Sequence, residues 1–161
     1  MPELGPHNAV WDDGEWVGWD WINSELAKAE LREQYPNADL KLIPVFQELL
    51  SSAQEYFWAT GSHLSVYGDI GELFGAITYG IKLHRNYAQG SDGRLGNDFV
   101  EVKTITPFKG HDTVEVKASG HFSKLLIVKI GEDFKVLGKL VDRSALPKPR
   151  GKNIRVSWND L

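Results

Sequence analysis

The segment from Lys124 to Ile130 most constrains the fold of this chain, because its sequence KLLIVKI is almost continuously apolar. Strands with one face in water alternate apolar and polar residues, whereas an uninterrupted apolar run is typical of a strand covered on both faces. We therefore expect this segment to be a central strand of a layered α/β fold. Further strands are predicted in segments rich in β-branched and aromatic residues, at 99–105, 113–118, 134–141 and 154–158.

Three helices are predicted before these strands, and capping residues mark two of their ends. Asn23 or Ser24 suits the N-cap of the first helix, and Gly61 suits the residue after the second. The helices are expected over 24–35, 44–59 and 64–83.

The order of these elements predicts an α/β fold in which N-terminal helices are followed by a central mixed β-sheet. No linker or low-complexity segment divides the 161 residues, so we expect a single domain over 1–161. Within it we expect an N-terminal arm over 1–22, a helical region over 23–62 and the functional core over 63–161.

The composition excludes several classes of function. Cysteine is absent, which rules out cysteine nucleophiles and leaves only oxygen or nitrogen ligands for a metal. No apolar run approaches the ~20 residues of a membrane span, and residues 1–6 lack signal-peptide features, so we expect no membrane association and a cytoplasmic location. The formal net charge of −4 gives no global signal for nucleic acid, although a local basic patch can still bind it.

Four of the six tryptophans fall within an acidic segment near the N-terminus. Burial of large aromatic side chains is strongly favourable, so we expect the arm to place its indoles on the body of the domain. The alternative is a surface that binds a protein partner or forms a homodimer. The four residues are Trp11, Trp16, Trp19 and Trp21.

A short repeat occurs in the second half of the chain, where Gly-x-Asp-x-Val-Glu-Val-Lys spans 96–103 and again 110–117. Residues two apart on a strand share a face, so Glu101 and Lys103 are expected side by side. Two adjacent antiparallel strands with charge pairs across them would explain the repeat structurally. The Glu-x-Lys pair is therefore not distinctive without its context.

The first copy of the repeat differs from the second in the acidic residues that precede it. Asp92 lies in a Gly-rich turn, and Glu72 lies in the predicted third helix with Gly68 and Gly75 near it. Each interior glycine costs a helix roughly 1 kcal/mol against alanine, so we expect a strand or ligand to approach this face closely. An exposed position on the helix surface is the alternative for Glu72.

This ordered set of helix, Asp, turn and Glu-x-Lys resembles the PD-(D/E)xK nuclease superfamily, and more narrowly a group of small uncharacterised proteins with the same core. The likeness covers about residues 64–145, and Ser91 stands where the family prefers proline. It implies a restriction-endonuclease-like core. It also implies hydrolysis of phosphodiester bonds, with DNA as the expected substrate and Mg²⁺, or alternatively Mn²⁺, as the cofactor.

The resemblance implies a role for each residue of the set. Asp92 and Glu101 would be metal ligands together with the carbonyl of Val102, and Glu72 would be an accessory ligand to the metal or to its bound water. Lys103 would orient the attacking water and stabilise charge in the transition state.

Two further assignments follow from position in the chain. Asp98 is an alternative metal ligand to Asp92, but on a strand its odd separation from Glu101 would place it on the opposite face. A basic cluster after the third helix either contacts nucleic-acid phosphates or is a solvated helix end. The cluster consists of Lys82, His84 and Arg85.

Two other functions remain open on the sequence. One is a non-catalytic module with the same fold that binds nucleic acid or protein. The other is a charged β-sheet in which both Val-Glu-Val-Lys segments are only structural.

Overall fold

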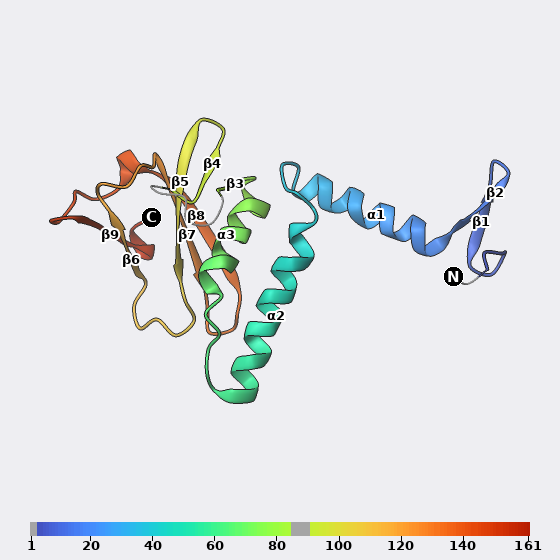
Figure 1. Ribbon diagram of the computed structural model, residues 1–161, viewed down its shortest axis with the longest axis horizontal. Coiled ribbons are helices and arrows are strands. Elements are labelled where there is room, and N and C mark those ends of the chain that lie inside the picture. Colours follow the sequence, from blue (N-terminus) through green and yellow to red (C-terminus); the bar gives the residue numbers. More distant parts are fainter. Residues whose placement is uncertain (1–2, 85–90) are drawn as a thin grey trace. The chain divides into compact units, whose positions relative to one another are not determined.

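The computed structural model describes residues 3–84 and 91–161, and the chain forms two compact units (Figure 1). The first unit ends at Pro36 and the second covers Asn37–Leu161. The boundary lies inside the helical region expected over 23–62, and not at the end of the expected arm. The fold is mixed α/β, as the sequence predicts.

A β-hairpin begins the first unit, with strands β1 (Ala9–Asp12) and β2 (Glu15–Gly18). Trp11 and Trp16 lie opposite each other in this hairpin, and their ring centroids are 5.3 Å apart in an edge-on arrangement. Two of the four clustered indoles therefore pack on one another. Because this hairpin precedes every helix, the expected order of helices before strands is not seen.

The helix α1 (Trp19–Gln34) follows β2 without a loop, and Gly18 is its N-cap. The predicted start at Asn23 or Ser24 is wrong, because the chain turns from strand to helix before it reaches them. No residue of α1 is buried. The roles of its exposed indoles stay predictions.

Two helices belong to the second unit, α2 (Leu42–Thr60) and α3 (Tyr67–Thr78). Gly61 ends α2 in the left-handed conformation with φ of 72°, which confirms its predicted place. The third helix is shorter than the predicted 64–83, because Gly80 has φ of 73° and so cannot continue the helix. Among the described residues, no helix is long and apolar enough to cross a bilayer.

Five strands form the main sheet in the order β3-β4-β5-β7-β8. Neighbouring strands are antiparallel except for β5 and β7, which are parallel, so the sheet is mixed as expected. The strands are β3 (Lys82–Leu83), β4 (Gly93–Leu95), β5 (Asp98–Ile105), β7 (Lys124–Ile130) and β8 (Val136–Asp142).

The strand β7 lies in the interior of this sheet and forms its most buried part. Residues 125–128 are 0% exposed, which confirms the prediction of a strand covered on both faces. Two 3₁₀ helices, η1 (Arg143–Ala145) and η2 (Trp158–Asp160), follow β8 and the last strand of the chain.

A separate two-stranded antiparallel sheet is formed by β6 (Thr113–Lys117) and β9 (Asn153–Ser157). The two copies of the repeat therefore lie on β5 and β6, which belong to different sheets. Pairing of adjacent antiparallel strands therefore does not explain the repeat, because β6 pairs instead with a segment much later in the chain. Its apolar side chains match those of β9, with Val114 opposite Val156.

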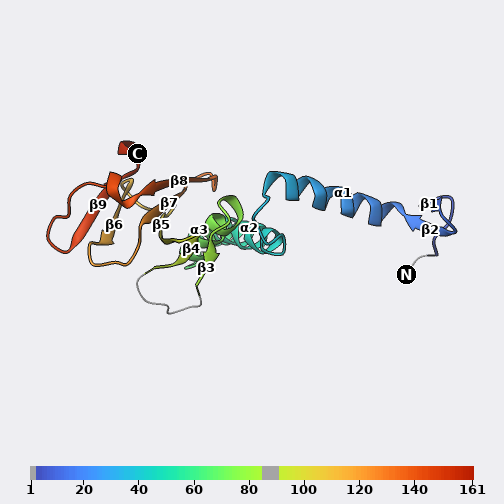
Figure 2. The ribbon, with the colours of Figure 1, turned by 90° about the horizontal axis from the view of Figure 1, so that it is seen from above.

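The main sheet lies between two layers within the second unit (Figures 1 and 2). The helix α3 packs on one face and α2 packs on α3, while the β6–β9 sheet covers the other face. Alternate residues of β5 serve the two layers, with Val100 and Val102 in the helix-side core and Ile105 in the core under β6 and β9. Glu101 and Lys103 therefore share the side of β5 that Ile105 occupies.

Candidate active site

The candidate site lies just before the start of β4, where β5 continues beyond its pairing with β4. The last pair between these strands joins Gly93 to Val100. Beyond it, the Asp92 N–H donates to the Val100 carbonyl at 2.9 Å, and Oδ2 of Asp92 accepts the Val102 N–H at 2.6 Å. Because the N–H and C=O of one strand residue point to the same side, the Val102 carbonyl faces this edge too.

Glu101 and Lys103 project together from the β5 face opposite Val102, as the two-residue period predicts. Nζ of Lys103 lies 3.0 Å from Oε1 of Glu101, and both side chains are half-buried. Burial raises the pKa of Glu101, and the negative charge of Asp92 raises it further, while Lys103 and Lys117 lower it. Glu101 and Asp92 are therefore close enough to repel each other.

Glu72 lies on α3, whose backbone comes very close to β5. A Cβ atom added to Gly71 would lie 2.1 Å from Oγ1 of Thr104 on β5, so only glycine permits this approach. Gly75 similarly lies close to the sheet, but Gly68 faces open space. Of the two glycines expected to allow a close approach beside Glu72, Gly75 does so and Gly68 does not.

The carboxylates around Glu72 act on one another electrostatically. Burial is the main cause that raises the pKa of Glu72 to about 7, and the charges of Asp92, Asp69 and Glu101 raise it as well. Glu72 is therefore not the isolated surface residue that was the alternative. The repulsion in this cluster would be relieved by a proton or a bound cation.

The donor atoms at this edge are suited to a hard divalent cation. The carboxylates of Asp92 and Glu101 and the carbonyl of Val102 are oxygen ligands of the kind that Mg²⁺ prefers. No three His, Asp or Glu side chains of the described residues form a ready-made group for a metal ion. The carboxylates are bonded within the chain, Asp92 to the Val102 N–H and Glu101 to Lys103. A cation would have to replace one or both of these contacts.

A hollow of about 450 Å³ beside Glu101 brings the two copies of the repeat together. Glu101 and Lys103 line it from the first copy, and Glu115 and Lys117 line it from the second. Glu72, which lies on α3, is not among its lining residues. The remaining lining residues are Ser91, Asp92, Gly120, Phe122 and Asn153.

Lys117 and Asn153 are site residues that the sequence reasoning missed. The cross-strand register of β6 and β9 places them opposite each other at the end of the small sheet that borders the hollow. The signal for Lys117 was the repeat itself, which was interpreted as a structural charge pattern. No motif marks Asn153.

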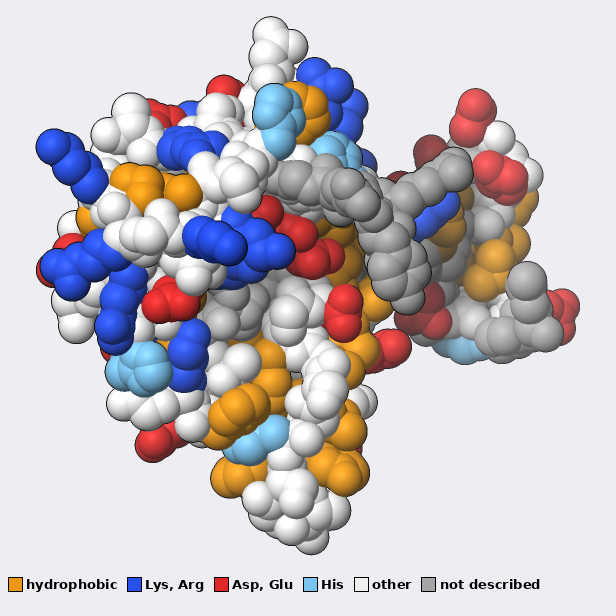
Figure 3. Space-filling model, turned by 60° about the vertical axis from the view of Figure 1, so that its left-hand side comes forward, with side chains coloured by type: hydrophobic (Ala, Val, Ile, Leu, Met, Phe, Trp, Pro, Cys, Tyr) orange, Lys and Arg blue, Asp and Glu red, His pale blue; other side chains and the backbone are white. Residues whose placement is uncertain are grey.

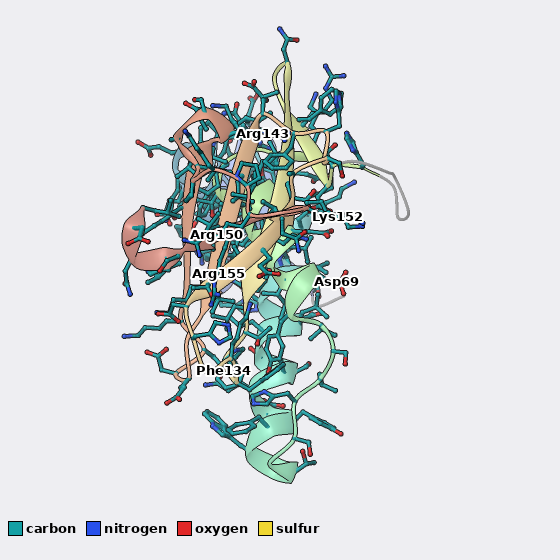
Figure 4. The ribbon with its side chains drawn as sticks, turned by 90° about the vertical axis from the view of Figure 1, so that its left-hand side faces the viewer. Asp69, Phe134, Arg143, Arg150, Lys152 and Arg155 are labelled. Carbon is teal, nitrogen blue, oxygen red and sulfur yellow. The ribbon has the colours of Figure 1, made fainter. Side chains whose placement is uncertain are left out.

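The loop between β6 and β7 forms one wall of the hollow and is held by Arg143 of η1 (Figure 4). The Arg143 guanidinium donates to the carbonyls of Gly120 at 2.6 Å and Phe122 at 3.1 Å, and also to that of Ala118. Its charged plane lies 4.5 Å from the centre of the Phe122 ring. Arg143 therefore fixes the shape of this wall.

Asp98 lies at the other end of the β4–β5 pairing from Asp92. It is paired with Leu95 across the hairpin, and its Oδ1 accepts a hydrogen bond from Oγ of Ser123 at 2.8 Å. Asp92, not Asp98, is therefore the aspartate whose charge acts on Glu101.

The basic cluster after α3 is only partly described. Lys82 is exposed on β3, and Nδ1 of His84 lies 3.3 Å from the Ser91 carbonyl. The backbone N–H of His84 also donates to the Asp92 carbonyl at 2.9 Å, so His84 supports the segment that carries Asp92. Arg85 lies outside the described residues.

Comparisons with known proteins assign no family to this chain. No protein-family model matches the sequence, and no curated protein sequence matches it. The resemblance to PD-(D/E)xK nucleases therefore stays a prediction.

Proposed function

We propose that this chain is a metal-dependent nuclease with a restriction-endonuclease-like core that hydrolyses phosphodiester bonds, with DNA as the substrate. The observation that carries the proposal is the hollow that Asp92, Glu101 and Lys103 line together, with Glu72 of α3 near enough for the charges of both acids to raise its pKa. Their order on α3, before β4 and on β5 is also the order of the resemblance.

The donor set assigns the ligands of the proposed metal. Asp92, Glu101 and the Val102 carbonyl would hold the ion, and Glu72 would contact it or its bound water from the side of α3. When bound, Mg²⁺ or Mn²⁺ would supply charge neutralisation and lower the pKa of a water molecule.

Lys103 has the role of holding the reacting groups in place. Its ammonium group now rests on Glu101 at 3.0 Å, so once that carboxylate binds elsewhere it is free to donate to the attacking water or to a phosphate oxygen. In the hydrolysis, the water oxygen bonds to phosphorus, one P–O bond to a sugar breaks, and a proton passes to the departing oxygen. Lys103 would stabilise the negative charge that develops on the phosphate during this exchange.

Plasmid and labelled oligonucleotide substrates with Mg²⁺ or Mn²⁺ test this function. We expect the wild type to cleave DNA, and Lys103→Ala and Asp92→Asn to lower the rate by roughly 100-fold or more, because each removes a group that acts on the reacting phosphate. Asp98→Asn is the matched control and should retain the wild-type rate, because Asp98 bonds to Ser123 away from Glu101. Cleavage that survives both Lys103→Ala and Asp92→Asn would overturn this site.

A second candidate is a binding module that does not cleave nucleic acid. The observation that favours it is the ion pair of Lys103 with Glu101, which occupies a carboxylate that the metal would need. Calorimetric titration with Mn²⁺ separates the two functions. A nuclease should bind the ion with an affinity that Glu101→Gln weakens, whereas a binding module should bind nucleic acid without binding the ion.

A further inference from the structure

The outward face of the β6–β9 sheet and the loop that leads into β9 carry a concentration of positive charge. Between Pro147 and Ser157 the chain has four basic residues and no acidic one, although its formal net charge is −4. All four are exposed. Figure 3 shows Lys and Arg side chains gathered over this side of the molecule, next to a smaller group of Asp and Glu side chains. The four residues are Lys148, Arg150, Lys152 and Arg155.

The strand register explains why the cations of this sheet face outward. Val114, Val116, Ile154 and Val156 are buried against the main sheet, so the residues that alternate with them point to solvent. The outward positions form cross-strand pairs, which are Thr113 with Ser157, Glu115 with Arg155, and Lys117 with Asn153, and the three charged residues among them are exposed. This face is therefore polar, with Glu115 as its one acidic residue.

The positive charge of this face is available to a ligand. The ion pairs among the described residues involve other lysines, namely those at 28, 103, 124, 129 and 135. Arg150, Lys152 and Arg155 lie on the same side of the molecule in Figure 4, and none of the three takes part in these pairs. Two of them are arginines, whose planar donors match phosphate oxygens.

The charged face leads into the candidate site. Lys117 and Asn153, at one end of the small sheet, line the same hollow as Asp92 and Glu101. The positive charge of Lys117 also acts on Glu101. A polyanion lying along the sheet would therefore pass directly beside the carboxylates.

We propose that Lys117, Arg150, Lys152 and Arg155 form a docking surface for the sugar–phosphate backbone of nucleic acid, which we call the basic ribbon. The choice of nucleic acid as the ligand rests on the proposed function. The position of the surface rests on the register of β6 with β9 and on the exposed basic residues. A membrane surface is a poorer fit, because the outward positions of β6 and β9 carry no apolar side chain that would insert into lipid.

The test measures binding without hydrolysis. A fluorescent DNA duplex of about 20 base pairs is titrated with protein in EDTA at several salt concentrations. The variant Arg150→Ala/Lys152→Ala/Arg155→Ala should weaken the affinity by roughly tenfold or more at low salt, and it should reduce the slope of log K against log salt by about 3. The control Lys28→Ala/Lys41→Ala/Lys135→Ala removes the same charge elsewhere and should leave the affinity within about twofold of the wild type.

Three results would overturn the basic ribbon. The ribbon variant could bind like the wild type, the control could lose as much affinity as the ribbon variant, or polyglutamate could compete as well as unlabelled DNA. If the triple variant does not fold, the exposed single substitution Arg155→Gln replaces it and should weaken binding about threefold. Unchanged affinity in that variant contradicts the proposal equally.

The outcomes separate this inference from the proposed function. Loss of duplex binding in the ribbon variant, with no cleavage by the wild type, would support the docking surface and reject the nuclease. Cleavage by the wild type, with a ribbon variant that binds and cleaves equally well, would reject the docking surface alone.

Discussion

Glu72 is a residue of the candidate site whose pKa lies near neutral pH. Its pKa is raised from 4.5 to about 7, so between these values the folded chain holds a proton that the unfolded chain has released. The stability that this proton contributes is present below pH 4.5 and is lost as the pH rises through 7. Without a bound cation, the ionised site at pH 8 is therefore less stable than the protonated one.

Glu72→Gln should remove this part of the pH dependence, because glutamine stays neutral throughout. We expect the wild type to lose on the order of 1 kcal/mol of unfolding free energy between pH 4.5 and pH 8, and the variant to lose less. This magnitude is kept low because solvent reaches the half-buried carboxyl group. Urea unfolding at both pH values, in EDTA, measures the difference. Identical pH profiles for the two proteins would contradict the raised pKa.

At the scale of elements, Arg143 connects the end of β8 to the β6–β7 loop, which lines the hollow. Arg143→Ala removes its hydrogen bonds to three carbonyls and its contact with the Phe122 ring. We expect a loss of about 2 kcal/mol in unfolding free energy, measured by urea denaturation. Arg94→Ala is a matched control, because Arg94 is exposed and lies over the Phe99 ring at 5.2 Å without such carbonyl bonds. A loss as large in the control would show that the carbonyl bonds contribute little.

The elements that the sequence predicted well are those determined by local pattern. The apolar run of β7 and the two-residue period of β5 depend only on neighbouring residues, and both are present as predicted. Gly61 also ends its helix where the sequence places a stop. Asp92 and Glu101 are found at one strand edge for a similar reason, since a tight hairpin joins β4 to β5.

The misses come from pairing over long distances in the chain. The partner of β6 is β9, which follows two further strands, so nothing in the repeat itself indicates that Lys117 would border the site. The start of α1 was missed for another reason. A β-hairpin that leads directly into the helix overrides the capping preference of Asn23 and Ser24.

At the scale of the whole molecule, occupation of the proposed metal site should change stability. A cation that binds only the folded chain adds about 2.7 kcal/mol when its concentration is 100 times the dissociation constant. We expect Mg²⁺ to raise the melting temperature of the wild type by several degrees at pH 8, and not that of Asp92→Asn. Asp98→Asn should behave like the wild type. Differential scanning calorimetry measures the melting temperatures. An equal rise in all three proteins would place the ion elsewhere.

The hydrogen bond from the Val102 N–H to Asp92 also bears on how copies of this chain behave when concentrated. A strand edge with open backbone groups is a template on which a strand of another molecule can add, which leads to aggregation. The Asp92 carboxylate accepts the N–H of Val102 and places a negative charge just before the start of β4, where such an addition would begin. We therefore expect the same side chain that is proposed to bind the cation to hinder the addition of a foreign strand at this edge.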